Sequence, residues 1–274
     1  MYSIFSISAF SEINPKITPK LPYTFNIDKD LLLLNFDLKT DVDDVHTVAA
    51  LDLILKSGPF KHLNYFAISG TYGVQSGLYV PANHLFDLIF KQNWTDAHMQ
   101  RQQAINDTSD RIASNLASGG HVWVMEAGQS DFTQQLMQHL ANSGNPVPKN
   151  KMVVVQHSDW NEKETSQGAL AFVKQHITYV KVPDGNASAN GTSDFNNAQF
   201  KVKNLENNQL PSADAWHDAN KVSRQYKGTN GRYRNDAIDN GRADFSDLVE
   251  VVWILGITDV DTVEAFFEKF NTKP

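Results

Sequence analysis

Four carboxylates stand within eight residues near the start of the chain, and they are the side chains best suited to do chemistry. They are Asp37, Asp41, Asp43 and Asp44. Carboxylates this close repel one another, so they do not all stay ionised without a counter-charge. A helix N-terminus offers a partial positive charge, and a divalent cation that prefers oxygen ligands offers a larger one. The spacing therefore indicates a metal site, with one capping aspartate among solvated loop acids as the alternative.

The residues on either side of these acids show which elements must position them. Leu31, Leu32, Leu33 and Leu34 form an apolar run with almost no alternation, which is typical of a strand buried on both faces of a parallel sheet. From 45 to 55 the apolar residues recur at helical spacing. The acids thus occupy a strand-to-helix turn at the carboxyl end of a strand, where open α/β sheets bind ligands. This setting favours the metal site over the alternative.

Strands and helices alternate through the rest of the chain. We expect strands over 63–68, 121–125, 151–156 and 177–182, and helices over 83–90, 107–116, 132–140, 166–175, 248–255 and 259–270. This order predicts an α/β fold of Rossmann-like kind, a mostly parallel sheet with helices on both faces. A chain of 274 residues suffices for one such domain, and we expect a single domain over 1–274.

The segment 183–240 differs from the remainder. It is rich in Asn, Ser, Gly and Asp and has a helical pattern only over 213–226. A long polar segment inside a compact domain is more often a functional flap than a plain connector. The alternative is a partly ordered surface insertion.

Composition excludes several function classes. The absence of cysteine rules out disulfides, thiolate metal sites and a cysteine nucleophile. A net charge of −7 without a Lys/Arg cluster indicates no nucleic-acid partner. No apolar run reaches the roughly 18 residues of a membrane span, so we expect no membrane partner. Residues 1–10 lack the features of a signal peptide, and we expect mature sequence there and a cytoplasmic protein. A homo-oligomer is compatible with this composition.

Polar residues also follow the other expected strands. Because the carboxyl ends of parallel strands share one edge of the sheet, these residues should face a common crevice. They are Thr71 and Tyr72; Glu126, Gln129 and Asp131; His157, Asp159, Trp160 and Asn161; and Asp244. Oxygen ligands from several loops favour a hard-cation site more strongly than any one loop does.

These motifs together resemble the nucleoside hydrolase superfamily. Its first strand ends in Asp-Thr-Asp-Pro-Gly-x-Asp-Asp, and this chain has Phe-Asp-Leu-Lys-Thr-Asp-Val-Asp-Asp over 36–44. The spacing is more similar to a divergent branch that includes nucleoside-hydrolase-like proteins described as cellulose-binding, whose longer loop ends Asp-Pro-Asp-Asp. Further matches follow in the family's order at 67–73, 122–131, 153–159 and 243–246. The resemblance covers roughly 31–180 and 241–256.

The resemblance implies a Ca²⁺-dependent hydrolase that cleaves the N-glycosidic bond of a nucleoside or a related ribosyl compound. It implies that Asp37 binds the metal and takes a proton from the metal-bound water. Asp44 and Asp244 would be further carboxylate ligands, and Glu126 would supply a main-chain carbonyl. An all-oxygen set of this kind is what Ca²⁺ prefers.

The same resemblance implies which residues meet the substrate, a small nucleoside or sugar-like ligand. Asp43 would accept hydrogen bonds from sugar hydroxyls, with Asn161 as a further sugar contact. Cleavage passes through a positively charged oxocarbenium-like state, and the departing base needs either an acid or aromatic stacking. His157 and Trp160 are the candidates for these tasks, followed by Trp216 and His217.

Lys39 departs from the family pattern and keeps two other functions open. An ammonium group in the acidic turn would repel a metal or replace it as the counter-charge, unless it points away into solvent. If Lys39 occupies the metal position, a non-catalytic sugar- or nucleoside-binding protein of the same fold is favoured. A phosphohydrolase of the haloacid dehalogenase type is the other alternative, because Asp37 to Thr40 resembles its Asp-x-Asp-x-Thr signature. That class needs an acid where Lys39 stands, which places it last.

Overall fold

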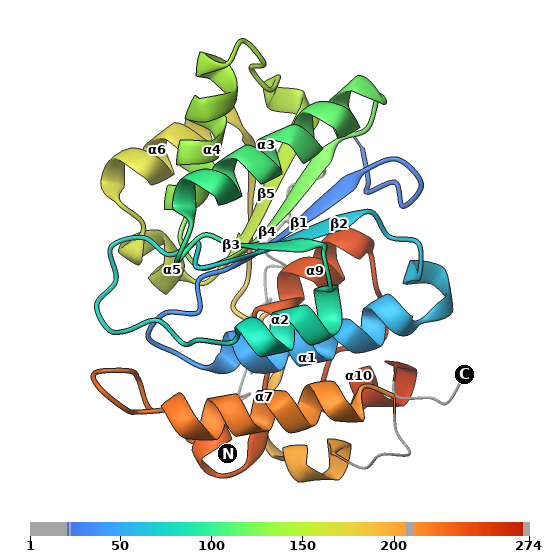
Figure 1. The fold of residues 1–274 in the computed structure, drawn as a ribbon. Coiled ribbons are helices and arrows are strands. Elements are labelled where there is room, and N and C mark those ends of the chain that lie inside the picture. Colours follow the sequence, from blue (N-terminus) through green and yellow to red (C-terminus); the bar gives the residue numbers. More distant parts are fainter. Residues whose placement is uncertain (1–20, 22, 207–210, 271–274) are drawn as a thin grey trace, which may run out of the picture.

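The protein is built around a six-stranded parallel sheet. The computed structural model describes residues 21–270 apart from 22 and 207–210, so the expectation for residues 1–10 lies outside the described residues (Figure 1). Every neighbouring pair of strands in this sheet is parallel, in the order β3-β2-β1-β4-β5-β6. The strands are β1 (Leu31–Phe36), β2 (Tyr65–Ser69), β3 (Trp94–Asp96), β4 (Val122–Ala127), β5 (Met152–His157) and β6 (Thr178–Val182). The predicted α/β fold is confirmed.

Helices cover both faces of the sheet, and each face has its own apolar core. Leu32, Leu34 and Phe36 of β1 belong to one core, and Leu31 and Leu33 to the other. The first core includes α1 (Asp43–Lys56), α2 (Asn83–Phe90), α7 (Ala213–Tyr226), α9 (Leu248–Leu255) and α10 (Val263–Phe270). The second includes α3 (Arg101–Ala117), α4 (Asp131–Asn142) and α6 (Gln167–His176), as Figure 1 shows. A strand buried on both sides must be apolar at successive positions, which explains the unbroken leucine run.

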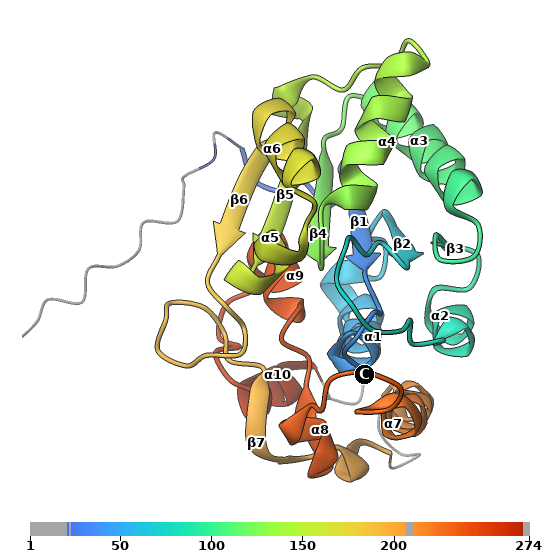
Figure 2. The ribbon, with the colours of Figure 1, turned by 90° about the vertical axis from the view of Figure 1, so that its left-hand side faces the viewer.

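The segment 183–240 is partly built into the first core. It contains β7 (Asn196–Lys201), the predicted helix α7 and the short α8 (Asp236–Asp239), and β7 pairs antiparallel with β8 (Arg242–Asp244). Helix α7 packs along α1, and its Trp216 is fully buried against Phe245 and Phe267. The carboxyl ends of the sheet strands point toward this part of the chain (Figure 2). The segment is therefore more than a surface connector.

The strand order places one crevice at a defined point. The chain leaves β1 toward β2 and β3 on one side, whereas β4, β5 and β6 lie on the other. Ligands of open α/β sheets bind where the order reverses in this way, here between the carboxyl ends of β1 and β4. The two loops meet closely at this point, because a Cβ on Gly128 would lie 2.6 Å from the Cβ of Asp37. Gly128 also has φ of 136°, a conformation that L side chains rarely adopt.

No helix in the described part of the chain is both long and apolar enough to cross a membrane.

Candidate metal centre

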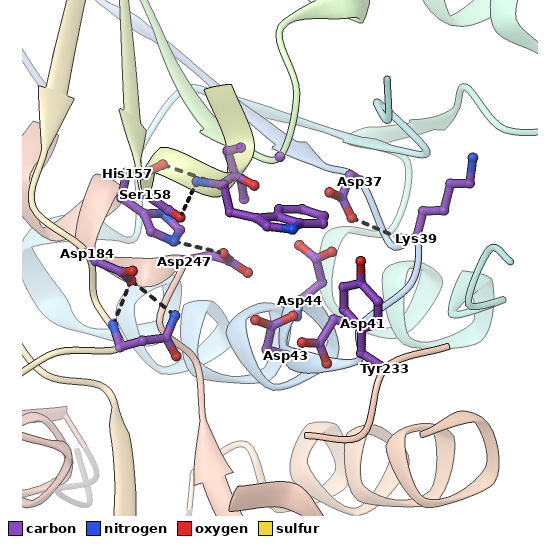
Figure 3. Close-up of a pocket in the computed structure, with 15 residues that line it drawn as sticks. Asp37, Lys39, Asp41, Asp43, Asp44, His157, Ser158, Asp184, Tyr233 and Asp247 are labelled. Carbon is purple, nitrogen blue, oxygen red and sulfur yellow. Dashed lines mark hydrogen bonds and ion pairs between the residues drawn. The ribbon is translucent and has the colours of Figure 1, made fainter. Parts of the chain in front are cut away.

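A pocket of about 280 Å³ opens at this crevice (Figure 3). The acidic turn after β1, the glycine turn after β4 and the residues after β5 all contribute to its wall. Eight of the residues singled out from the sequence line it: Asp37, Lys39, Asp41, Asp43, Asp44, His157, Trp160 and Asn161. Loops far apart in the sequence thus converge as expected for parallel strands.

Three carboxylates come together in the pocket. Asp43 and Asp44 begin α1, and Asp247 directly precedes α9 near the other end of the sequence. One oxygen of each lies within 4.8 Å of the other two. Oxygen ligands stand 2.3–2.6 Å from Ca²⁺, so any two around one ion are at most about 5 Å apart. We call Asp43, Asp44 and Asp247 the acid triad, and its dimensions fit a single calcium ion.

Asp44 carries the clearest sign of a missing partner. Its Oδ2 accepts a hydrogen bond of 2.7 Å from the Leu38 amide, whereas its Oδ1 is buried without a hydrogen-bond partner among the described residues. Burial is the main cause that raises the pKa of Asp44 and of Asp43 well above the ordinary value, and the neighbouring carboxylates raise both further. A buried, unpaired carboxylate oxygen costs free energy that a cation would recover.

The backbone of the acidic turn is held in an unusual conformation. Leu38 and Thr40 have φ of 48° and 84°, a left-handed region that costs non-glycine residues of order 1–3 kcal/mol each. Hydrogen bonds from the surroundings fix it: Val80 donates to the Leu38 carbonyl at 2.7 Å, and the Tyr233 amide donates to the Thr40 carbonyl at 2.6 Å. Strain of this kind persists where the surrounding structure determines it, and it is commonly found at functional sites.

Asp37 lies beside the acid triad and is firmly oriented. Its Oδ2 accepts hydrogen bonds from the side-chain amides of Gln75 at 3.1 Å and Gln129 at 3.0 Å, and its Oδ1 accepts one from the Lys39 amide at 2.9 Å. Burial raises its pKa while the bonds from Lys39 and Gln129 lower it, which leaves the pKa at about 6. A fixed carboxylate with a near-neutral pKa is suited to act as a general base.

Lys39 points away from the acids. Its Nζ lies over the ring of Tyr72, 4.4 Å from the ring centre, and Figure 3 shows its side chain directed away from Asp44. It forms no ion pair with a carboxylate in the described part of the chain. The ammonium group therefore leaves the position between the acids open to a cation.

His157 links Asp247 to a second buried acid. Its Nδ1 lies 3.2 Å from Oε1 of Glu250, and its Nε2 lies 3.6 Å from Oδ1 of Asp247. Burial alone would lower its pKa, but the hydrogen bond to Glu250 and the charges of Glu250 and Asp247 outweigh burial and raise the pKa to about 9. A cationic His157 offsets part of the charge of the acid triad. Both ring nitrogens face carboxylates, so the ring is placed to orient Asp247.

We expect His157→Asn to weaken calcium binding about 10- to 100-fold, as the loss of a group that orients a metal ligand typically does. The variant removes the contact that orients Asp247 while every triad carboxylate stays in place. Loss of the imidazolium charge alone would favour Ca²⁺, so the expected loss of affinity comes from the orientation of Asp247. Titration calorimetry with Ca²⁺ measures the effect. His176→Asn, at an exposed histidine on α6, is the matched control. An unchanged affinity in a correctly folded His157→Asn would contradict this role.

The structure places three of the four expected metal ligands, Asp37, Glu126 and Asp244, outside the acid triad. The Glu126 side chain accepts hydrogen bonds from Thr133 and Asn35 instead of reaching the pocket, and its carbonyl accepts the Gly128 amide at 2.8 Å. Asp244 accepts a 2.7 Å hydrogen bond from Asn235, and it lines a neighbouring cavity. Burial raises the pKa of Asp244 to about 7. Asp247, which the sequence analysis did not select, is the late acid in the triad.

Aromatic and amide groups complete the pocket wall. Trp160 lies on α5 (Asp159–Glu164), which the Ser158 hydroxyl caps by accepting the Trp160 amide at 3.0 Å. The Trp160 ring is 6.0 Å from that of Tyr233 and nearly perpendicular to it. Asn161 donates a side-chain hydrogen bond to the His157 carbonyl at 3.4 Å, so it also holds this turn. The other two leaving-group candidates are elsewhere: Trp216 is in the core and His217 is exposed beside Glu206.

Comparison with known proteins adds no relative. No protein-family model matches the chain, and a search of curated proteins finds no match. The resemblance to nucleoside hydrolases therefore depends on the motifs given above and stays a prediction.

Proposed function

We propose that this chain is a calcium-dependent hydrolase that cleaves the N-glycosidic bond of a nucleoside or a related ribosyl compound. The observation that supports it best is the acid triad, in which Asp247 meets Asp43 and Asp44 around a buried Asp44 oxygen that accepts no hydrogen bond from the described residues. Carboxylate oxygens alone form a donor set suited to Ca²⁺. The site also lies at the sheet position where α/β proteins bind small ligands.

Each residue of the pocket has a task in this reaction. When bound, the cation would lower the pKa of a water and orient it toward the sugar. Asp37 accepts the proton of the attacking water. The carboxylates of the triad stabilise the positive charge that develops on the sugar, and Asp43 accepts hydrogen bonds from its hydroxyls. The base departs with the electron pair of the broken bond and takes a proton from solvent, and Trp160 and Tyr233 offer ring surfaces against which it stacks.

The orientation of Lys39 bears on the alternatives. A sugar-binding protein without activity is favoured if the ammonium group takes the metal position, and it lies over Tyr72 instead. The phosphohydrolase alternative requires Asp37 to act as a nucleophile, but three N–H donors hold its carboxylate. These observations support the hydrolase proposal over both alternatives.

The direct test incubates the protein with a panel of purine and pyrimidine nucleosides and measures the release of free base by chromatography. We expect release with Ca²⁺, none after chelation, and recovery when Ca²⁺ is returned. Tight Ca²⁺ binding without any base release would favour the binding protein. Phosphate release from an aryl phosphate would favour the phosphohydrolase.

We expect the calcium-free protein to lose stability as the pH rises from about 4 to 8. The folded-state pKa values are about 6 for Asp37, 7 for Asp244 and 8 for Asp247, against an ordinary value of 3.8. Between these limits the folded state binds more protons than the unfolded state, so stability falls with rising pH. The raised pKa of His157 acts in the same direction above 6.5.

Calcium should therefore stabilise the protein more at pH 8 than at pH 5. At 100 times its Kd the ion contributes about 2.7 kcal/mol, or about 5–10 °C in Tm for a domain of this size. Thermal unfolding with Ca²⁺ or a chelator at both pH values measures the difference. Equal shifts at the two pH values would contradict the expectation.

A further inference from the structure

A second cavity, of about 410 Å³, adjoins the pocket. It lies along α8 and β8, and it shares Asp41, Asp43 and Asn186 with the pocket wall. A ligand that contacts Asp43 in the pocket is thus directly beside this cavity. No step of the proposed reaction uses this cavity.

The lining of the second cavity suits hydrogen bonding rather than stacking. Side-chain amides and guanidinium groups dominate it, namely Asn186, Asn196, Asn235, Asn240, Arg234 and Arg242. Ala237 is its one apolar residue among those described, and none of them is aromatic. Trp160 and Tyr233, by contrast, line the first pocket. A flat base therefore fits the pocket, and a group rich in hydroxyls fits the cavity.

The charged groups that line the cavity favour a neutral ligand over an anionic one. Four carboxylates line the cavity, Asp41, Asp43, Asp236 and Asp244, against two guanidinium groups. One of those groups, Arg234, is already paired with Asp239 at 2.7 Å. A phosphate dianion only accepts hydrogen bonds, so it cannot use the carboxylates, whereas sugar hydroxyls can donate to the carboxylates and accept from the amides.

Arg242 supplies further donors at the edge of the cavity. Its side chain forms no ion pair or hydrogen bond with another described residue, although it lies on β8 at the edge of the cavity. A hydroxyl oxygen can accept from it without a change in the surrounding ion pairs.

We propose that the substrate carries a second, uncharged sugar unit on its ribosyl group and that this cavity binds that unit. The proposal rests on the function proposed above, which places the ribosyl group beside Asp43. The substrate class is then a glycosylated nucleoside rather than a simple one.

Pseudouridine and its 2′-O-, 3′-O- and 5′-O-ribosyl derivatives test the proposal, because their carbon–carbon glycosidic bond resists hydrolysis during a titration. Calorimetry is carried out on the full chain with saturating Ca²⁺. We expect at least one ribosyl derivative to bind about tenfold more tightly than pseudouridine, a gain that two added hydrogen bonds provide. Pseudouridine 5′-phosphate should show no such gain.

Asn240→Trp fills the cavity from an exposed position and should abolish the tenfold gain, while the affinity for pseudouridine itself stays unchanged. Gln138→Trp, exposed on α4 across the sheet, is the matched control. Arg242→Met keeps the aliphatic stem and should reduce the gain, which provides a second variant if Asn240→Trp does not fold.

The outcomes separate the two proposals. If pseudouridine binds and no ribosyl derivative binds more tightly, the second sugar site is overturned and the proposed function stands. A gain for the 5′-phosphate alone also overturns it, because the cavity then selects an anion. If none of these compounds binds, the second sugar site is overturned, and base release from the nucleoside panel decides the proposed function separately.

Discussion

Asp247→Asn is expected to weaken calcium binding by at least about 100-fold, beyond the effect of losing an orienting group. The variant removes the one ligand that comes from the distant end of the sequence and leaves only Asp43 and Asp44 of the triad. The same change should raise the Tm of the calcium-free protein at pH 8. Burial and the charges of Glu250 and Asp37 raise the Asp247 pKa to about 8, although the His157 charge opposes them. Its ionised form is therefore destabilising there.

This pair of opposite effects distinguishes loss of a ligand from misfolding, which would lower both quantities. Calorimetry gives the calcium affinity, and thermal unfolding with a chelator gives the Tm. Asp52→Asn is the matched control, because Asp52 is a buried acid of α1 that pairs with Lys56 outside the pocket. An unchanged calcium affinity in Asp247→Asn would contradict the acid triad as the calcium site and, with it, the proposed function.

Asp37→Asn is expected to lower kcat for nucleoside hydrolysis about 10²- to 10⁴-fold, the range of a positioned general base. The amide cannot accept the proton of the attacking water. Calcium affinity should change far less, because Asp37 lies beside the triad rather than within it. Steady-state kinetics and calorimetry on the same preparation give both values.

The pH profile provides an independent check on Asp37. The wild-type rate should fall at acid pH, where the Asp37 carboxylate becomes protonated, and this fall should vanish from the residual activity of Asp37→Asn. Because a bound cation favours the ionised carboxylate, we expect the midpoint of this fall to lie below the Asp37 pKa of about 6 in the calcium-free protein. Asp41→Asn is the control in the same turn, and any effect should appear in KM rather than in kcat. If the rate of Asp37→Asn still falls at acid pH in the same way, another group is the general base.

The parts of the site that depend on local pattern could be predicted from the sequence. The buried strand β1, the acidic turn and helix α1 follow from an unbroken apolar run, clustered acids and helical spacing. Strand β3 is absent from that prediction, because three residues carry too little pattern to indicate a strand. Gln75 and Tyr233 also escape prediction, because they lie outside the helices and strands and show no periodicity.

The late acid shows where local pattern stops being informative. Asp244 and Asp247 are three residues apart, and each precedes or begins an apolar helix in the sequence. Which one reaches the pocket depends on the turn between β8 and α9 and on the pairing of β8 with β7, both of which are tertiary features. Glu250 is the one available signal, because an acid within an apolar helix needs a buried partner, and His157 is that partner.

The hydrogen bond between the Tyr233 amide and the Thr40 carbonyl has a kinetic consequence. Tyr233 lines the pocket, so this bond connects one part of the pocket wall to the acidic turn that would bind the ion. A cation that fixes the conformation of the acidic turn also fixes this part of the pocket wall. We therefore expect ordered binding, in which the ion binds first and the organic ligand second. Release would then run in reverse, with the ion retained over many turnovers.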